Sequence, residues 1–358
     1  MKNIDFSRRN WTVLVLFGLI GQIAWSVEYM YFNLFLFETI APSLETVTLM
    51  VQLSGVVATV VTLIAGTLSD SVGNRRTFIS AGYFIWGITV ALFGFISPEL
   101  TSEILNLDAT KSIAVTLGLV VVADCVMTLF GSTANDASFN AWVTDNTKPS
   151  FRGTVEGVIA ILPLIAMLIV AGGFGIIVSV IGYNMMFLIL GITISLCGIV
   201  GFFIIKDSNA LQKNGTLKDL FFGFKPSVVK ANARLYKILL IVVTYGIACQ
   251  VFMPYLIIYM TTYLKFNVLE YSVVFGGAII IGAVINVALG RLSDRKDKVS
   301  LLTIASLIMV IGLAAMYVCR FESKIITLLT FGIAGFVMIT GYIFVSALCG
   351  SMIRDNTT

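Results

Sequence analysis

Ten apolar runs, most of them about twenty residues long, follow one another along the chain and constrain its fold more than any other feature. A helix of about 20 residues crosses the roughly 30 Å apolar core of a bilayer. Only 12% of the 358 residues are charged, whereas a soluble domain holds about 25%. The sequence therefore predicts an all-α polytopic membrane protein with helices near residues 11–36, 46–68, 77–96, 112–135, 153–178, 183–205, 236–260, 270–290, 299–319 and 324–349.

The basic residues are unevenly distributed over the loops between these runs. With the N-terminus in the cytoplasm, 19 of the 23 Lys and Arg residues lie on the cytoplasmic side. Because such an excess marks the cytoplasmic loops of membrane proteins, we predict this orientation and an integral protein of the cytoplasmic membrane. The net charge of +4 then describes a surface facing anionic lipid and does not indicate binding to nucleic acid.

A Lys-rich connection divides the runs into a group of six and a group of four. We therefore predict an N-terminal six-helix bundle over residues 1–206, a cytoplasmic linker over 207–235 and a C-terminal four-helix bundle over 236–358. The sequence Asp145-Asn-Thr after the fourth run returns as Asp355-Asn-Thr after the tenth. Parallel repeats of this kind are typical of transporters whose halves move about a central site. By this symmetry the second half lacks two helices, so a shortened chain is expected.

The clearest repeat is a short charged turn. It reads Gly66-Thr-Leu-Ser-Asp70-Ser-Val-Gly73-Asn-Arg75-Arg76 between the second and third runs, and it returns as Gly290-Arg-Leu-Ser-Asp294-Arg295 between the eighth and ninth. Glycine permits a tight reversal of the chain, and Arg favours the cytoplasmic face. The Asp lies where one helix ends, and it can pair with the basic residues that open the next helix.

This turn resembles the signature of the major facilitator superfamily between spans two and three, and its repeat resembles the counterpart between spans eight and nine. Within the superfamily, the chain resembles the glycoside–pentoside–hexuronide cation symporters and the related sucrose–proton symporters. The closer resemblance rests on Gly21-Gln22-Ile-Ala24 with Tyr29-Met30-Tyr31, on Asp136-Ala-Ser-Phe139-Asn-Ala141-Trp-Val143, and on Gln250-Val-Phe-Met-Pro254-Tyr255. It implies a two-bundle helical fold, here ending after the tenth of twelve helices, and secondary active transport of a sugar or glycoside with alternating access.

The resemblance also implies a conformational lock, a charge network that holds the cytoplasmic side closed and breaks on opening. The alternative is that Arg75 and Arg76 serve only the orientation in the membrane. The residues expected in this lock are Gly66, Asp70, Gly73, Arg75, Arg76, Asp145, Arg152, Glu156, Gly290, Asp294 and Arg295.

The resemblance also indicates which residue binds the coupled cation and which cation it is. Asp136 matches the cation-site aspartate of the similar symporters. In their melibiose-permease branch, acidic residues of span two help to hold sodium, whereas Ala58 and Thr62 stand at the equivalent positions here. The resemblance therefore favours coupling to protons through a carboxylate over coupling to sodium.

Glu28 is the most informative single acid in the chain. It lies deep in the first run, with no basic residue near it in sequence. An ionisable group inside the bilayer is costly unless it faces water or a partner. Because burial disfavours the charged form of a carboxylic acid, Glu28 is a candidate for binding and releasing the coupled proton. The alternative is an acid bonded permanently to a neighbouring helix.

Polar and aromatic side chains recur at helical spacing in several runs. In the first run, Gln22, Ser26, Tyr29 and Asn33 share one face of an α-helix, with Trp25 beside it and Glu28 at its margin. Amides, hydroxyls and aromatic rings suit a polyhydroxylated sugar, although polar bonding between helices uses the same residue types. The predicted substrate-binding residues are Gln22, Trp25, Ser26, Tyr29, Asn33, Asp124, Asn135, Tyr245, Gln250, Tyr255 and Asn286. For Asp124, pairing with a hydroxyl is the alternative.

Other function classes find no support in the residues. Histidine is absent, and the five cysteines lie singly in apolar runs, so neither a metal site nor a disulfide is expected. The sequence contains no phosphate loop or nucleophile arrangement, so we predict neither an enzyme nor a cofactor. The expected partners are a sugar or glycoside, a proton and the lipid bilayer. Two alternatives stay open: a transporter of drug-like or lipid-like amphiphiles, suited by 26 Phe and 13 Met, and a membrane sensor or scaffold that does not transport.

Overall fold

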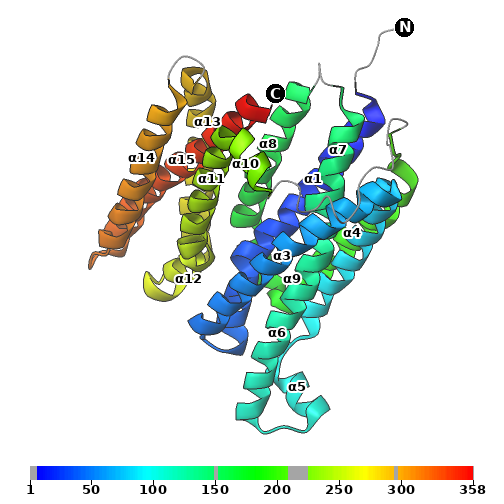
Figure 1. Ribbon diagram of the computed structural model, residues 1–358. Coiled ribbons are helices and arrows are strands. Elements are labelled where there is room, and N and C mark those ends of the chain that lie inside the picture. Colours follow the sequence, from blue (N-terminus) through cyan, green and yellow to red (C-terminus); the bar gives the residue numbers. More distant parts are fainter. Residues whose placement is uncertain (1–5, 149–151, 209–224, 294–296, 358) are drawn as a thin grey trace. The chain divides into compact units, whose positions relative to one another are not determined.

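The computed structural model describes residues 6–148, 152–208, 225–293 and 297–357, and every regular element in this part of the chain is a helix (Figure 1). The prediction of an all-α polytopic membrane protein is confirmed. Eight helices among the described residues are long and apolar enough to cross a membrane: Arg8–Ile40, Leu44–Val72, Arg75–Phe95, Ala109–Asn146, Ile161–Ile204, Ala233–Tyr263, Lys298–Val318 and Lys324–Gly350.

One of these regions differs from the spans expected from sequence, because it covers two of them. The run Ile161–Ile204 is interrupted at Gly182, whose φ of 76° and ψ of 169° are not helical, and only glycine adopts such a conformation readily. This break separates the expected spans 153–178 and 183–205. The span expected at 270–290 corresponds to the helix Val268–Ser293. With the one difference at Gly182, the observed helices account for all ten expected spans.

The chain forms two compact units. Unit 1 comprises Met1–Ala166 and Ile177–Phe222, and unit 2 comprises Met167–Ile176 and Gly223–Thr358. In the first half of the chain the elements are α1 (Arg8–Val27), η1 (Glu28–Phe32), α2 (Asn33–Phe35), η2 (Leu36–Ile40), α3 (Leu44–Val72), α4 (Arg75–Leu92), η3 (Phe93–Phe95), α5 (Pro98–Leu105), α6 (Ala109–Gly131), η4 (Ser132–Phe139), α7 (Asn140–Asn146), α8 (Arg152–Ile169), η6 (Val170–Phe174) and α9 (Gly175–Ile204).

The second half continues in the same all-helical manner. The segment expected as a linker contains α10 and the start of α11, because α11 begins earlier than the span predicted at 236–260. The elements are α10 (Pro226–Ala231), α11 (Ala233–Phe252), η8 (Met253–Tyr255), α12 (Leu256–Ile258), η9 (Tyr259–Tyr263), α13 (Val268–Ser293), α14 (Lys298–Val318) and α15 (Lys324–Thr357). Here η3 and η8 are 3-10 turns, and the other η elements are π-helical.

Small residues bring α4 and α9 into close contact in unit 1. A Cβ built on Gly87 would lie 2.3 Å from the backbone of Gly191 and Ser195, and one built on Gly198 would lie 2.3 Å from the backbone of Phe84. Membrane helices associate through such small residues because their backbones can then approach closely. This contact therefore fixes one side of α4, while its Tyr83 and Trp86 rings pack against Phe17 and Trp25 of α1.

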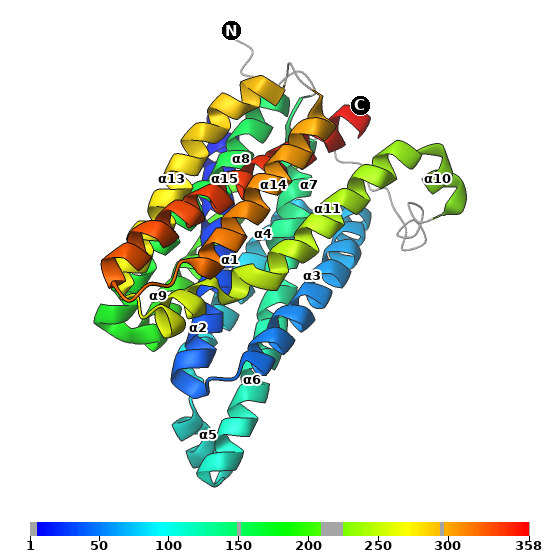
Figure 2. The ribbon, with the colours of Figure 1, turned by 90° about the vertical axis from the view of Figure 1, so that its left-hand side faces the viewer.

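The loop expected at residues 97–111 is partly helical, and α5 lies at the end of α6 (Figures 1 and 2). Ser97 caps α5 by accepting a hydrogen bond from the backbone of Leu100 at 3.1 Å, and Pro98 occupies the first turn. Asp108 caps α6 in the same way, accepting from the backbone of Lys111 at 3.0 Å. This N–H and the Lys111 ammonium, 3.0 Å away, lower the pKa of the exposed Asp108 carboxyl.

In unit 2, α15 packs against α11, α13 and α14 (Figure 2). A Cβ built on Gly312 of α14 would lie 2.4 Å from the backbone of Met338 of α15, and Tyr245 of α11 donates a hydrogen bond to the carbonyl of Tyr342 at 2.8 Å. Pro254 interrupts the seventh expected span, because proline cannot continue the backbone hydrogen bonding of an α-helix. The chain passes through the 3-10 turn η8 at this point.

Candidate functional site

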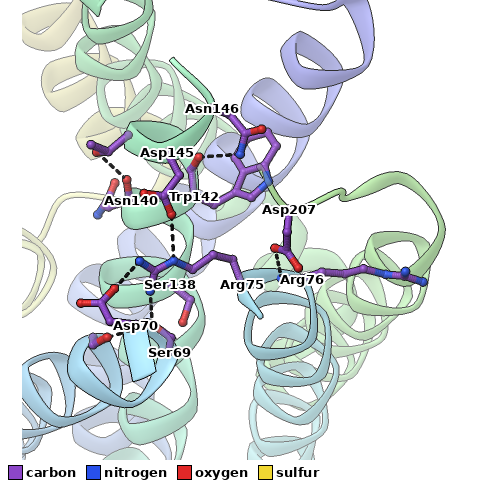
Figure 3. Close-up of polar contacts among 12 residues, drawn as sticks. Ser69, Asp70, Arg75, Arg76, Ser138, Asn140, Trp142, Asp145, Asn146 and Asp207 are labelled. Atoms are coloured by element: carbon purple, nitrogen blue, oxygen red, sulfur yellow. Dashed lines mark hydrogen bonds and ion pairs between the residues drawn. The ribbon is translucent and has the colours of Figure 1, made fainter. Parts of the chain in front are cut away.

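The charged turn of the sequence forms a polar cluster at one end of unit 1, and we call Ser69, Asp70, Arg75 and Asp145 the Arg75 cluster (Figure 3). Helix α3 ends at Gly73, whose φ of 65° is left-handed and therefore favours glycine. Asn74 then caps α4 by accepting from the backbone of Thr77 at 3.0 Å. Arg75 thus becomes the first residue of α4.

Arg75 joins three helices. Its Nε donates to Asp145 Oδ2 of α7 at 3.0 Å, while its terminal nitrogens donate to the Asp70 carboxylate and the Ser69 hydroxyl of α3. The residue is only 4% exposed. Because a buried charge without partners is strongly destabilising, these acceptors allow the guanidinium to be buried, and they tie the ends of α3 and α7 to the start of α4.

A second set of contacts holds the same region to the end of α9. The Arg76 backbone donates to the Asp207 carboxylate at 2.9 Å, and its side chain donates to the carbonyl of Phe202. The Trp142 indole donates to the carbonyl of Lys206 at 2.8 Å. The contacts of Ser69, Trp142 and Asp207 were not predicted, because a hydroxyl, an indole and an acid before a linker carry no distinctive pattern.

The repeat of this turn is described only in part. Asp297 caps α14 by accepting from the backbone of Ser300 at 2.8 Å, as Asn74 caps α4, so the two turns share a capped helix start. Of the residues expected in the lock, the following lie outside the described residues or side chains: Arg152, Glu156, Gly290, Asp294 and Arg295.

A second polar region lies among the helices of unit 1, and we call Glu28, Asp124 and Asp136 the carboxyl cluster. Glu28 is 8% exposed and Asp124 is 1% exposed, whereas Asp136 is half-buried. Both Asp124 and Asp136 are near enough to Glu28 for their charges to act on it. None of the ion pairs between described residues involves these three carboxyls.

The carboxyl cluster is surrounded by polar groups that lack partners. The Thr128 hydroxyl donates a long hydrogen bond of 3.5 Å to Glu28 Oε1, while Glu28 Oε2 and Asp124 Oδ1 accept none in the described structure. The Ser132 hydroxyl and the Trp25 indole N–H lie toward the Asp136 carboxyl, but within the described structure neither meets the geometry of a hydrogen bond. Since buried polar groups are nearly always hydrogen-bonded, this region has capacity for a proton, water or a polar ligand.

Two irregular helical segments place these residues. Glu28 opens the π-helical segment η1, and Asp136 lies in η4. Such segments are frequent at functional sites, because the extra residue per turn changes the direction of the side chains. Of the residues predicted on one face of the first span, Ser26 and Asn33 are buried, whereas Tyr29 is 48% exposed.

The rings beside the carboxyl cluster pack tightly. Trp25 of α1 and Trp86 of α4 have ring centroids 4.9 Å apart, and a Cβ on Gly131 would come within 2.8 Å of both rings. A Cβ on Gly21 would lie 1.9 Å from Asn135 Nδ2. Trp86 was not among the predicted site residues, although its position in a span that also holds Gly82 and Gly87 could have suggested close packing.

The remaining predicted substrate residues are dispersed. Gln22 is half-buried in α1, and Gln250 is exposed in α11. The Tyr245 hydroxyl is engaged with Tyr342, and Asn286 lies outside the described side chains. Tyr255 lines a pocket of about 280 Å³ in unit 2, formed by Val251, Phe252, Tyr255, Leu256, Tyr259, Leu313, Met316 and Tyr317.

The comparison with protein families decides the classification. Residues 14–358 match the sequence profile of the Major Facilitator Superfamily. The chain belongs to the Major Facilitator Superfamily. Proteins of this family are transporters, and the chain is accordingly an integral membrane protein that binds a small-molecule substrate and sits in lipid.

Solved structures agree with this family assignment at the level of the fold. A mutant of the nucleoside transporter NupG is similar with a TM-score of 0.69 and 11% identity, over 98% of this chain and 87% of that one. A bacterial homologue of the human lysosomal transporter Spinster, inward-facing and unoccupied, is similar with a TM-score of 0.61 and 13% identity, over 98% and 79% of the two chains. No curated protein matches the sequence.

Proposed function

We propose that this member of the Major Facilitator Superfamily is a proton-coupled symporter of a sugar or glycoside, in the cytoplasmic membrane with its N-terminus inside. The observation that carries the proposal is the carboxyl cluster: buried acids in a membrane bundle, without an ion pair between described residues. A charged carboxylate is unfavourable in such surroundings, so these acids favour binding a proton. Glu28 and Asp136 are the proposed coupling residues.

The substrate side of the proposal rests on the groups around this cluster. The indole N–H of Trp25 and the amide of Asn135 are buried donors without partners in the described structure. Sugars offer hydroxyl acceptors to such donors and an apolar face to aromatic rings. The resemblance to the glycoside–pentoside–hexuronide and sucrose symporters supports the same substrate class, with Gln22, Ser26 and Asn33 as further contacts.

The Arg75 cluster supports the proposed conformational lock. Its ion pairs join three helices at one end of unit 1, and a change in helix positions would have to break them. In an alternating-access cycle, the conformation with the cytoplasmic side closed would keep these contacts, and the conformation with this side open would lose them.

One observation favours a second candidate function, transport of an amphiphile. The pocket lined by Tyr255, Tyr259 and Met316 is almost wholly apolar and aromatic, which suits a drug-like or lipid-like molecule better than a sugar. Most of the buried polar groups without partners in the described structure, Trp25 and Asn135 among them, lie in unit 1 instead, and they favour the sugar.

The first test is the external pH of de-energised cells that express the chain. Sucrose, melibiose, the nucleoside uridine and the amphiphile ethidium would be added in turn. Proton–sugar symport predicts alkalinisation with a sugar, because protons enter with the substrate. The Glu28→Gln variant should abolish the signal, whereas Glu45→Gln, a change at an exposed acid of α3, should preserve it.

Each alternative has its own result in this test. A signal with ethidium alone would favour amphiphile transport. Inserted protein with no signal for any compound would favour a sensor or scaffold and would contradict the proposal for these substrates.

A further inference from the structure

We propose that Glu28 and Asp124 act as one proton-binding pair, so that Asp124 serves coupling rather than contact with the substrate. This inference rests on the proposed proton symport and deepens it. It reassigns Asp124, which the sequence placed among the substrate contacts.

The two carboxyls share one buried region although they come from different helices. Glu28 follows directly on α1, and Asp124 lies in α6. Thr128 of α6 donates a hydrogen bond to Glu28 although the two residues are 100 positions apart in the chain. Thr128 lies one helical turn after Asp124 on the same face of α6, so this hydrogen bond places Glu28 against that face. Each carboxyl keeps one buried oxygen without a partner in the described structure, Oε2 of Glu28 and Oδ1 of Asp124.

The described groups that lie near this pair are a third acid, hydroxyls and a thiol. Asp124 and the half-buried Asp136 both lie near Glu28. Ser54 of α3 lies next to the Asp124 carboxyl, and the Cys125 thiol lies near both Asp124 and Glu28. Tyr83 of α4 is near Asp136. Neither Lys nor Arg forms a described ion pair with either acid.

Two negative charges at such a place are far less favourable than one, because like charges repel strongly where water is excluded. Near neutral pH the pair therefore keeps at least one proton and gains or loses the second, and the last proton leaves only at higher pH. On uptake, a carboxylate oxygen takes a proton from a hydronium ion, an O–H bond forms and water is left. On release, the O–H bond breaks and water accepts the proton. The charge of the pair changes between zero and minus one.

A shared proton also accounts for the partnerless oxygens. When one acid is protonated, its O–H can donate to the other acid, and the hydroxyls of Thr128 and Ser54 can donate to the oxygens that remain. Interacting sites of this kind titrate as a unit rather than as two separate groups. This property separates a pair from two independent acids.

The test follows the infrared carbonyl absorption of protonated carboxyls in the reconstituted chain as the pH is raised without any substrate. The double variant Glu28→Gln/Asp124→Asn gives the absorption of all other acids, Asp136 included, and is subtracted. We expect the remaining absorption to be lost in two separated steps in the parent and in one step in Glu28→Gln and in Asp124→Asn. The titration curve of the parent should not equal the sum of the two single-acid curves, that of Glu28 measured in Asp124→Asn and that of Asp124 measured in Glu28→Gln. If the parent curve does equal this sum, the two acids titrate independently and the proposed pair is wrong. The control Glu45→Gln should change the curve only by the loss of the exposed Glu45 carboxyl.

If one amide variant does not fold, Glu28→Asp and Asp124→Glu keep the acid and change only its reach. Each should alter the titration of both carboxyls if they form a pair, and of one carboxyl if they do not. Because no sugar is present, these results stand even if sugar transport fails.

Transport then distinguishes the two assignments of Asp124. In Asp124→Asn, exchange of labelled sugar at equal pH should continue with the affinity of the parent, while proton-driven accumulation is lost. A loss of affinity at least tenfold in exchange would return Asp124 to the substrate site and would overturn its assignment to coupling.

Discussion

Arg75 Nε donates a hydrogen bond to Asp145 Oδ2 at 3.0 Å, which joins the first residue of α4 to the last turn of α7. The two residues are 70 positions apart in the chain. The buried guanidinium needs this acceptor and those on α3, so the contact links the charged turn to the fourth span, as the lock proposal requires (Figure 3).

Removing this acceptor should destabilise the protein. We expect Asp145→Ala to reduce the free energy of unfolding by about 2 kcal/mol, since hydrogen bonds to charged groups are worth about 1.5–3 kcal/mol. The melting temperature of the purified protein in detergent measures the effect. Asp207→Ala is the control, because its partner is an exposed backbone N–H, and it should change the free energy by no more than about 0.5 kcal/mol. Equal effects of the two changes would contradict the central place of Arg75.

The contact between α4 and α9 gives a second prediction. Gly191→Ala places a methyl group 2.4 Å from the backbone of Ala91, so the two helices must separate, and we expect a loss of about 1–3 kcal/mol. Gly118→Ala in α6 is the matched control, because no atom lies within 4 Å of its added Cβ. The control should be neutral or slightly stabilising. Melting temperatures of both variants test the prediction, and a stable Gly191→Ala variant would refute the close packing.

The proposed sugar contact of Trp25 predicts a selective effect on binding. Trp25→Phe keeps an aromatic ring but removes the indole N–H, which has no partner in the described structure. If a sugar hydroxyl accepts from this N–H, the apparent affinity should fall about tenfold, the equivalent of about 1.4 kcal/mol. Trp11→Phe, in the first turn of the same helix, is the control. Concentration dependence of labelled sucrose uptake is the measurement, and an unchanged affinity in Trp25→Phe would remove this residue from the site.

Asp297 predicts a dependence of stability on pH. The backbone N–H and hydroxyl of Ser300 donate to its carboxylate and lower its pKa below the usual value of 3.8. A lowered pKa means that the carboxylate stabilises the folded state above this value and that the contribution is lost as the pH falls through the pKa of the folded state. Asp297→Ala should therefore melt below the parent at neutral pH, and the difference should shrink in acid.

The matched variant for this prediction is Asp297→Asn. Asparagine also caps helices, but its amide does not titrate, so its melting temperature should not show the same acid dependence. A difference between parent and Asp297→Ala that stays constant down to strongly acidic pH would contradict the role of the carboxylate.

Much of the fold was predictable from the sequence, because apolar length alone specifies membrane helices. The end of α3 and the start of α14 were also predictable, since glycine favours the left-handed conformation that ends a helix and aspartate favours the capping position before one. The π-helical segments were not, because an extra residue in a turn depends on the packing of neighbouring helices rather than on local propensity. Tyr29, which lies in one of these segments, is 48% exposed, whereas Ser26 and Asn33 are buried.

The site was predictable in part. Acids inside apolar runs are conspicuous, so Glu28, Asp124 and Asp136 could be singled out from sequence. Their arrangement could not, because the Thr128–Glu28 hydrogen bond joins residues 100 positions apart. Trp86 was missed as well, since a Trp in an apolar span is not distinctive until its ring is found against Trp25.

The central claim is that the carboxyl cluster couples a proton gradient to sugar movement. The most direct measurement is accumulation of labelled sucrose or melibiose in proteoliposomes, with the interior neutral and the exterior acidic. We predict that the parent accumulates one of these sugars above its external concentration. The Glu28→Gln variant should only equilibrate it, and Glu45→Gln should behave as the parent. Accumulation that persists in Glu28→Gln, or that follows a sodium gradient at equal pH, would contradict the account.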